Sequence, residues 1–351
     1  MPPPVSRRRF LELAGSGAAG LITAGWWGRS AASQLPARGD LRLALISDLN
    51  ASYGSTSYIP QVQRGVELLA ALQPDLVLCA GDMVAGQKLG LSSGRLDAMW
   101  TSFARQVLEP VLRRSGGFAP AMGNHDASSS RGPDGFTFAL DRERAARFWR
   151  TRQGSLGLEF VEASRFPFRY SLRQGPLFAV VLDASSATVT AADWAWARAQ
   201  LDAPTARRAR LRMVMGHLPP YGVGLGRDRP GEVLNQPRQL QQLLADTRSH
   251  LYVSGHHHAY FPGTSGSLNL LSLGAMGSGP RRRLNDSSPP QHTLTVLDVF
   301  EGRGEVVDTT LELNGLQAVS PNRLPETLQP STGPRLRRRD RPLKLDPAVQ
   351  L

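Results

Sequence analysis

Short apolar runs that end in polar residues recur along the middle of the chain. Runs of this length and composition are typical of strands that are buried on both faces of a sheet. They occupy residues 41–47, 76–80, 177–182, 211–215 and 251–253. The pattern therefore predicts a set of central strands.

The segments between these runs carry apolar residues at helical spacing, over residues 62–72, 96–113, 191–201 and 237–247. Strands that alternate with helices predict an α/β fold, here a two-sheet α/β sandwich flanked by helices. From 267 to 313 the pattern changes to strands without helices. A turn at Glu301-Gly302-Arg303-Gly304 predicts a hairpin between residues 294–300 and 305–313, which we expect to close the second sheet.

The composition is that of an ordinary globular protein. With 351 residues, 41% hydrophobic and 20% charged, the chain can bury one large core or two modest ones. The single cysteine, Cys79, excludes an intramolecular disulfide and lies in an apolar run, as expected for a small core residue. We predict one main domain, residues 33–320, between two appended ends.

The positive charge is spread unevenly. The formal charge of +12 divides into +3 over residues 1–32, +4 over 321–351 and +5 over the long middle segment. That segment shows no dense stripe of basic and aromatic residues, so we expect no nucleic-acid partner.

The N-terminus resembles a twin-arginine export signal. Arg7-Arg8-Arg9-Phe10-Leu11 precedes a Gly/Ala-rich apolar stretch, residues 13–28, and then Ser30-Ala31-Ala32. The resemblance implies that residues 1–32 are a signal read by the twin-arginine export machinery, and that the protein is periplasmic or otherwise extracytoplasmic. A membrane anchor is the alternative, although the apolar stretch is short for a spanning helix.

The C-terminal segment, residues 321–351, mixes Pro, Arg, Ser and Thr without periodic apolar positions. This pattern predicts a basic, disordered tail. Membrane contact of the tail, through anionic lipid, stays open beside a solvated tail without a partner.

Polar clusters follow directly after the predicted strands. In open α/β sheets, ligand groups collect outside the carboxyl ends of the strands. Carboxylate, amide oxygen and imidazole suit a hard to borderline divalent or trivalent ion, and the number of donors suits two ions. The clusters are Asp48 with Asn50, Gly81-Asp82, Gly123-Asn124-His125-Asp126, Gly216-His217 and Gly255-His256-His257-His258.

In this order, the five clusters resemble the motifs of the calcineurin-like metallophosphoesterase superfamily, over residues 41–260 and best at 123–126 and 255–258. The resemblance implies a first metal on Asp48 and His258, a bridging Asp82, and a second metal on Asn124, His217 and His256. It also implies that His125 contacts the phosphate and protonates the leaving oxygen, with Asp126 orienting His125. In an extended segment His256 and His258 would face one side and His257 the other, which suits one ligand to each metal.

Asn50 departs from the family pattern, which places a histidine two residues after the first aspartate. An asparagine in place of this histidine weakens the first metal site. It also shifts the metal preference of that site from Zn toward Mn or Mg, because imidazole is the softer ligand. Asn50 could bind directly, bind through water, or cap the following turn. We expect two ions from among Mn, Fe, Zn and Mg, with Mn favoured, and a single-metal site stays open.

The function that follows is hydrolysis of a phosphate monoester or diester by in-line attack of a metal-bound hydroxide, with His125 as the acid. The alternative is a binding or scaffold protein on the same fold with a weakened or single-metal site.

The motifs do not identify the substrate beyond a phosphate ester. Arg131, Arg227 and Arg229 could hold a second anionic group or be solvated surface residues. Tyr221 and Trp100 could stack a ring of the substrate or serve in packing.

Overall fold

The structure, a computed structural model, describes residues 38–277 and 279–347. The predicted export signal, residues 1–32, lies outside the described residues. No helix in the described part of the chain is both long and apolar enough to cross a lipid bilayer.

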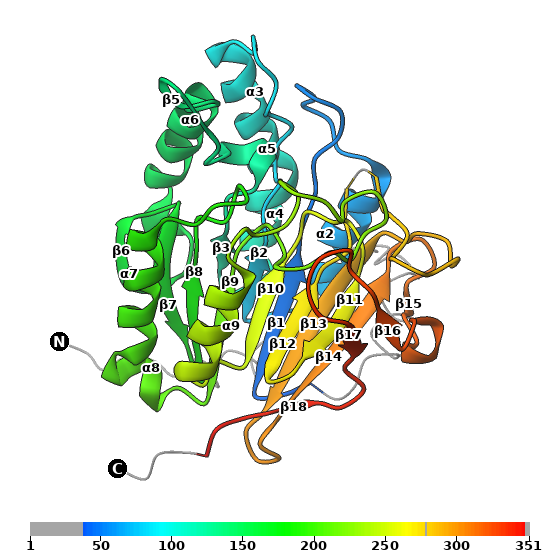
Figure 1. Cartoon of the computed structure of the whole chain (residues 1–351). Coiled ribbons are helices and arrows are strands. Elements are labelled where there is room, and N and C mark those ends of the chain that lie inside the picture. Colours follow the sequence, from blue (N-terminus) through cyan, green and yellow to red (C-terminus); the bar gives the residue numbers. More distant parts are fainter. Residues whose placement is uncertain (1–37, 278, 348–351) are drawn as a thin grey trace, which may run out of the picture.

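Two mixed β-sheets form the body of the molecule, and helices flank them (Figure 1). The first sheet has the strand order β15-β14-β13-β1-β2-β3, with β18 also paired to β14. Its strands are β1 (Leu41–Ile46), β2 (Leu76–Cys79), β3 (Phe118–Pro120), β13 (Thr293–Phe300), β14 (Glu305–Glu312), β15 (Gln317–Ala318) and β18 (Leu343–Lys344).

The second sheet has the order β16-β17-β11-β12-β10-β9-β8-β7-β6, and a small ribbon of β4 and β5 stands apart from both sheets. The strands are β4 (Arg131–Gly132), β5 (Gly135–Phe136), β6 (Glu159–Arg165), β7 (Arg169–Gln174), β8 (Leu177–Val181), β9 (Leu211–Met215), β10 (Leu251–Ser254), β11 (Phe261–Ser265), β12 (Leu268–Ser272), β16 (Thr327–Leu328) and β17 (Leu336–Arg338).

The helices lie between the strands in the chain, as the sequence predicted. They are α2 (Pro60–Leu72), α3 (Ser93–Phe103), α4 (Glu109–Leu112), α5 (Asn124–Ala127), α6 (Ala139–Arg150), α7 (Ala191–Asp202), α8 (Pro204–Arg208) and α9 (Pro237–Asp246). The predicted helix at 96–113 is divided by a π-helical turn, Ala104–Leu108. Pro110 explains the division, because it has no N–H to donate to the preceding turn.

The central strands β8, β9 and β10 of the second sheet are buried on both faces, which explains the continuous apolar runs in the sequence. Along β8, Leu177, Ala179 and Val181 belong to the core that includes the first sheet. Phe178 and Val180 belong instead to the core shared with α7 and α9. Alternate side chains of a strand point to opposite faces, so every position of β8 must be apolar.

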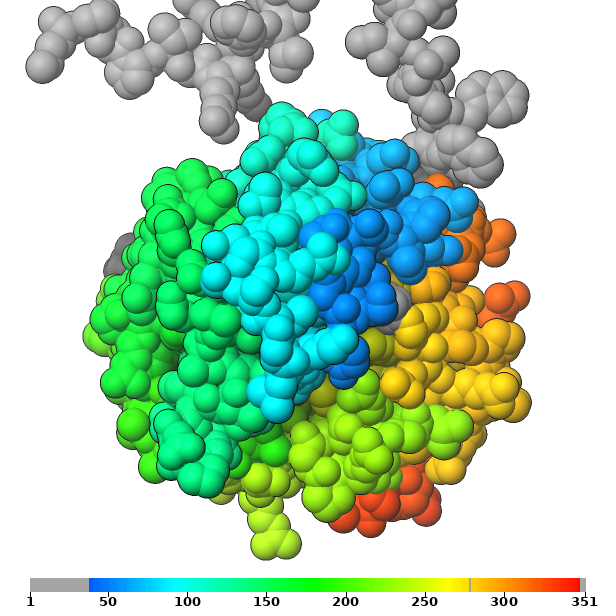
Figure 2. Space-filling model, turned by 90° about the horizontal axis from the view of Figure 1, so that it is seen from above, coloured from blue at the N-terminus to red at the C-terminus, as the bar shows by residue number. Residues whose placement is uncertain are grey.

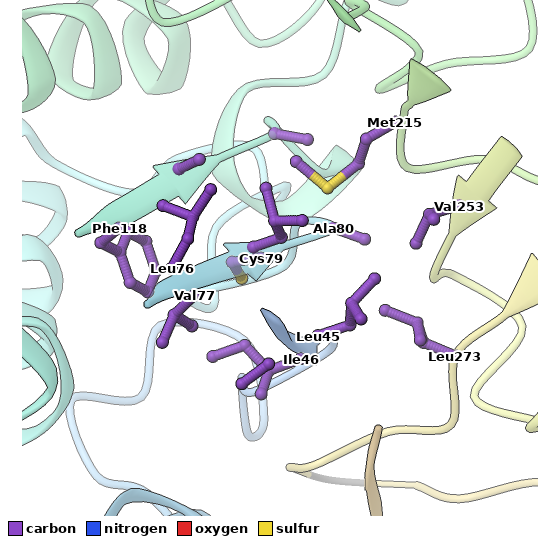
Figure 3. Packing of buried hydrophobic residues seen from close by; sticks show 14 of the residues in the cluster. Leu45, Ile46, Leu76, Val77, Cys79, Ala80, Phe118, Met215, Val253 and Leu273 are labelled. Carbon is purple, nitrogen blue, oxygen red and sulfur yellow. The ribbon is translucent and has the colours of Figure 1, made fainter. Parts of the chain in front are cut away.

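The shared core lies between one face of the first sheet and one face of the second. Leu45 of β1, Met215 of β9 and Val253 of β10 pack into one cluster (Figure 3). Strand β1 is parallel to β2, and β9 is parallel to both β8 and β10. The loops that leave these strands meet on one face, where segments distant in sequence lie together (Figure 2).

The predicted hairpin is present, and its two strands, β13 and β14, pair along their full lengths. Its place was predicted wrongly, because β13 pairs with β1 and so extends the first sheet. All eight residues of β13 are buried, which suits a strand with neighbours on both sides.

The prediction of a disordered tail is wrong for residues 321–347. Strand β17 pairs with β11, and β18 pairs with β14, so the segment adds strands to both sheets. Scattered leucines, Leu328 and Leu336 among them, are fully buried and supply the apolar anchorage that the sequence pattern did not reveal. Arg339 is tied to Asp308 of β14 by an ion pair of 2.8 Å, so part of the basic charge is structural.

Candidate metal centre

Four candidate ligands lie just beyond strand ends in the left-handed backbone conformation. Asp48 follows β1, Asp82 follows β2, and His256 and His258 follow β10, with φ angles of 55°, 57°, 67° and 54°. For residues other than glycine this conformation is uncommon, and it costs about 1–3 kcal/mol at each position. Such strain, repeated along one edge of the sheets, is typical of a functional site.

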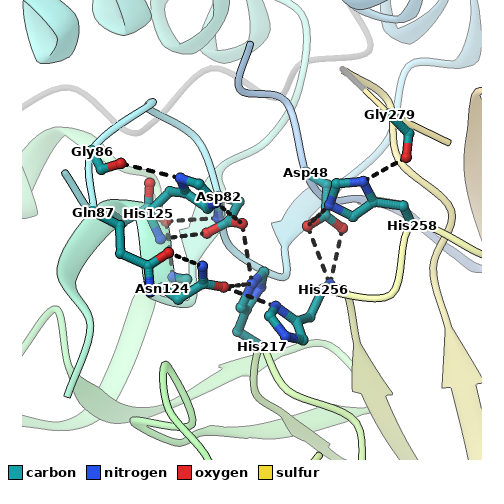
Figure 4. A network of polar contacts seen from close by, with 12 residues as sticks. Asp48, Asp82, Gly86, Gln87, Asn124, His125, His217, His256, His258 and Gly279 are labelled. Atoms are coloured by element: carbon teal, nitrogen blue, oxygen red, sulfur yellow. Dashed lines mark hydrogen bonds and ion pairs between the residues drawn. The ribbon is translucent and has the colours of Figure 1, made fainter. Parts of the chain in front are cut away.

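One set of donors, the second-metal group, consists of Asp82, Asn124, His217 and His256 (Figure 4). His217 Nε2 lies 3.3 Å from Asp82 Oδ2 and 2.9 Å from Asn124 Oδ1. His256 Nδ1 lies 2.8 Å from the same amide oxygen. The ligand atoms of Asp82, His217 and His256 all fall within 4.8 Å of one another, so one cation could contact all of them.

The other set, the first-metal group, consists of Asp48, Asp82 and His258, again with ligand atoms within 4.8 Å of one another. His258 Nδ1 contacts the Gly279 carbonyl oxygen at 2.8 Å, which leaves Nε2 facing Asp48 Oδ1 at 3.3 Å. Asp82 belongs to both groups, so it is the residue that could bridge two ions.

Asn50 lies close to the first-metal group in the chain fold, because its backbone N–H donates to the Asp82 carbonyl oxygen at 3.1 Å. Its side chain is buried, and in the described part of the chain its Oδ1 has no hydrogen-bond partner. That oxygen therefore caps no turn, which removes the structural alternative for it. A buried carbonyl oxygen without a partner costs about 1–3 kcal/mol, and a cation or a coordinated water would satisfy it. The donor set thus fits an oxygen-preferring divalent cation.

The buried charges in this centre are strongly coupled. Burial acts to raise the pKa of Asp82, but the neighbouring His217 and His125 outweigh it and leave that pKa well below its ordinary value. Burial likewise opposes protonation of His217, yet the Asp82 carboxylate raises the pKa of His217 to about 9. The Asp82 carboxylate is therefore held ionised, and a metal ion would replace the proton on His217.

Asp126 has a different role from the predicted one. Its carboxylate accepts backbone hydrogen bonds from Asp82 at 2.8 Å, from Gly123 at 2.9 Å, and from Met83 and Val84 at 2.8 and 3.0 Å. It therefore fixes the loop that carries Asp82. The His125 ring contacts the Gly86 carbonyl oxygen instead, through Nδ1 at 3.2 Å.

His125 stands beside the Asp82 carboxylate. Its backbone N–H donates to Asp82 Oδ1 at 2.8 Å, and its Nε2 lies 3.9 Å from Asp82 Oδ2. With Nδ1 directed at Gly86, a protonated His125 presents its other proton on Nε2. His125 is therefore placed to give a proton near the candidate metals.

His257 and Glu232 connect the centre to the loop at 219–236. His257 is fully buried, and its Nδ1 accepts hydrogen bonds from the backbone N–H groups of Val223 and Gly224 at 3.0 and 3.2 Å. It is thus a structural residue. Glu232, which the sequence reasoning missed, has its Oε2 2.8 Å from His256 Nε2. Little in the sequence indicated that Glu232 belongs to the site, since an acidic residue in a Gly/Pro-rich loop matches no motif.

The remaining candidates divide into packing and charge-paired residues. Trp100 and Tyr221 are buried, and Trp100 stacks on Phe148 at 4.7 Å, so both serve in packing. Arg227 and Arg229 form ion pairs with Glu232 at 2.6 and 3.1 Å. Arg131 lies over the Phe136 ring, in the wall of a cavity of about 500 Å³.

Comparison with known proteins agrees with this geometry. Residues 41–260 match the family described as calcineurin-like phosphoesterase. No curated protein sequence matches the chain.

Solved structures with a similar fold include GAP50, described as the anchor in the inner membrane complex of Plasmodium, with a TM-score of 0.53 and 11% identity over 88% of this chain and 90% of that one. YfcE, a phosphoesterase from E. coli, has a TM-score of 0.35 and 14% identity over 80% and 97%. Zinc-bound Vps29 from Entamoeba histolytica has a TM-score of 0.35 and 11% identity over 80% and 96%. At 11% identity, the likeness to GAP50 shows the fold alone.

Proposed function

Because the chain belongs to the calcineurin-like phosphoesterase family, we propose that it is a metal-dependent hydrolase of phosphate monoesters or diesters. The observation that carries the proposal is the pair of donor groups that share Asp82. Two cations bound there would polarise the phosphoryl oxygens and supply an activated water as the nucleophile.

Residues of the chain would supply charge balance, ligand orientation and the proton for the leaving group. Asp82 sits between the two groups and balances positive charge on both sides. Asn124 donates through Nδ2 to Gln87 Oε1 at 2.5 Å, which orients its amide oxygen toward His217 and His256. His125 gives its Nε2 proton to the oxygen of the leaving group, as a general acid.

The contrasting function is a scaffold or binding protein on the same fold. The buried, unpartnered Oδ1 of Asn50 and the strained backbone at four ligand positions favour the enzyme. Without a selected function, strain of that kind is lost readily, because each position relaxes on substitution.

The test is metal content and turnover on the same purified protein. We expect about two Mn ions per chain and hydrolysis of p-nitrophenyl phosphate or its bis-ester. Asp82→Asn should lose both bound metal and turnover while keeping the wild-type melting temperature within a few degrees. The matched control is Asp202→Asn, an exposed carboxylate paired with Arg207. A wild-type protein that binds no metal would establish the scaffold function instead.

We also propose export through the twin-arginine route, which rests on the sequence of residues 1–32 alone. Replacing Arg7 and Arg8 by lysine should leave the precursor in the cytoplasm, because the receptor reads the arginine pair. Fractionation of cells that express the two forms would check this, and normal export of the lysine variant would contradict it.

A further inference from the structure

Few large apolar side chains are exposed in the described part of the chain, and their positions are uneven. They are Tyr53, Leu89, Leu225 and Val161, with exposed fractions of 56%, 73%, 55% and 41%. Only Val161 lies on a regular strand, β6. The other three lie on loops that leave the strand ends around the candidate metal centre.

Tyr53 is in direct contact with the proposed acid. The centroids of the Tyr53 and His125 rings are 5.1 Å apart, and their planes are inclined by only 31°. The His125 side chain is 15% exposed, whereas Tyr53 is more than half exposed. Tyr53 therefore lies on the solvent side of the group that protonates the leaving oxygen.

The exposure of Tyr53 is imposed by a well-anchored turn. The Gly54 N–H donates to the Ala85 carbonyl oxygen at 2.6 Å, and Arg95 Nε donates to the Gly54 carbonyl oxygen at 2.6 Å. The turn is thus held on both sides, by the loop after β2 and by α3. A ring on such a support loses little conformational freedom when it binds a ligand.

Leu89 lies on the loop after β2, which also contacts His125. It is three residues from Gly86, whose carbonyl oxygen contacts His125, so its Cα lies within about 11 Å of that contact. Leu91 of the same loop approaches Gly54, next to Tyr53. The loop that carries Leu89 therefore runs beside the turn that carries Tyr53.

We propose that Tyr53 is the binding face for a planar, apolar leaving group, so that the substrates are aryl-type phosphate esters. The inference rests on the proposed function and deepens it. A leaving oxygen placed at His125 Nε2 brings the carbon group attached to it next to the Tyr53 ring. A planar group gains there from stacking, whereas a saturated group of equal size gains only from contact area.

The test compares phenylphosphonate with cyclohexylphosphonate, which match in size and differ in planarity and are not hydrolysed. Calorimetry on the Mn-loaded full chain should show phenylphosphonate bound about fivefold more tightly by the wild type. Tyr53→Ala should abolish this preference and Tyr53→Phe should retain it. The matched control is Val161→Ala, which removes an exposed apolar side chain far from the loops of the centre.

An unchanged affinity ratio in Tyr53→Ala would overturn the inference. If both probes also bind equally more weakly in that variant, Tyr53 only supports His125. Hydrolysis of phenyl phosphate by the same samples distinguishes a failure of the Tyr53 inference from a failure of the proposed hydrolase function. Turnover with an unchanged ratio rejects the role of Tyr53 alone, whereas a wild type that neither binds the phosphonates nor turns over rejects the proposed function as well.

Discussion

Glu232 Oε2 lies 2.8 Å from His256 Nε2 and fixes the tautomer of that histidine. With its proton on Nε2 and directed at the carboxylate, His256 keeps the lone pair of Nδ1 free on the side of Asn124 and Asp82. A carboxylate behind a ligating histidine orients the ring and raises its basicity. Arg227, 2.6 Å from the same oxygen, balances the charge of Glu232.

Truncation of this carboxylate should weaken metal binding without disturbing the fold. We expect Glu232→Ala to lower affinity at the second-metal group by about 10-fold to 100-fold, as is typical when such a partner is lost. Glu232→Gln retains an acceptor oxygen and should lose less. Competition with a chelator measures the affinity, and Glu143→Ala, an exposed glutamate of α6, is the control. Unchanged affinity in Glu232→Ala would show that His256 does not ligate.

Asn50→His should raise affinity at the first-metal group and shift preference toward Zn or Fe, because imidazole is the softer and stronger donor. The larger ring should also slow turnover where it crowds the bound water. Metal stoichiometry and rate, each measured under Mn and under Zn for both proteins, test this. If the wild type already holds two ions tightly and neither quantity changes, position 50 does not contact the metal.

Gly123→Ala should disrupt the bridging carboxylate. A Cβ at this position would lie 2.1 Å from Asp82 Oδ1 and 2.3 Å from the Asp82 nitrogen, closer than atoms can approach. We expect loss of bound metal and of turnover, with a lowered melting temperature, since buried backbone must move. Gly154→Ala adds the same methyl group where no atom lies within 4 Å, so it should behave as the wild type.

Leu336→Ala should destabilise the protein by about 2–5 kcal/mol, which is the usual cost of truncating a buried leucine. Leu336 is fully buried in the core shared with α7 and α9, although it belongs to the segment predicted to be disordered. Urea denaturation gives the free energy of unfolding, and Arg335→Ala, at the exposed neighbour, is the control. A change of less than about 0.5 kcal/mol would mean that the C-terminal strands are not part of the folded unit.

The features that could be predicted from the sequence are those that leave a local pattern of residue type or hydrophobic spacing. The central strands could be predicted because burial on both faces forces a continuous apolar run, as in β8. The candidate ligands could be placed because a strand end followed by Asp or His is a local feature. Asp82 and His217 are adjacent in space for that reason, although 135 residues separate them in the chain.

Features that depend on partners distant in the chain could not be predicted in this way. Three of the four hydrogen bonds of Asp126 depend on how the loop after β2 folds against α5, and no spacing in the sequence records that contact. Strands β17 and β18 are too short to show an alternating pattern. Their leucines can be recognised as core residues only once β17 is paired with β11 and β18 with β14. Tyr53 carries no motif, because its role comes from a turn that places it on His125.

Each histidine of the two candidate donor groups is held by a further group outside them: His217 by the Ala80 carbonyl oxygen at 2.7 Å, His256 by Glu232, and His258 by the Gly279 carbonyl oxygen. Ordering a free side chain on binding costs about 0.5–1.5 kcal/mol. Because these rings are already oriented by the protein, that entropic cost falls on folding and not on metal uptake. The affinity of the centre should therefore depend on donor chemistry and proton release, and hardly at all on loop length or chain flexibility around it.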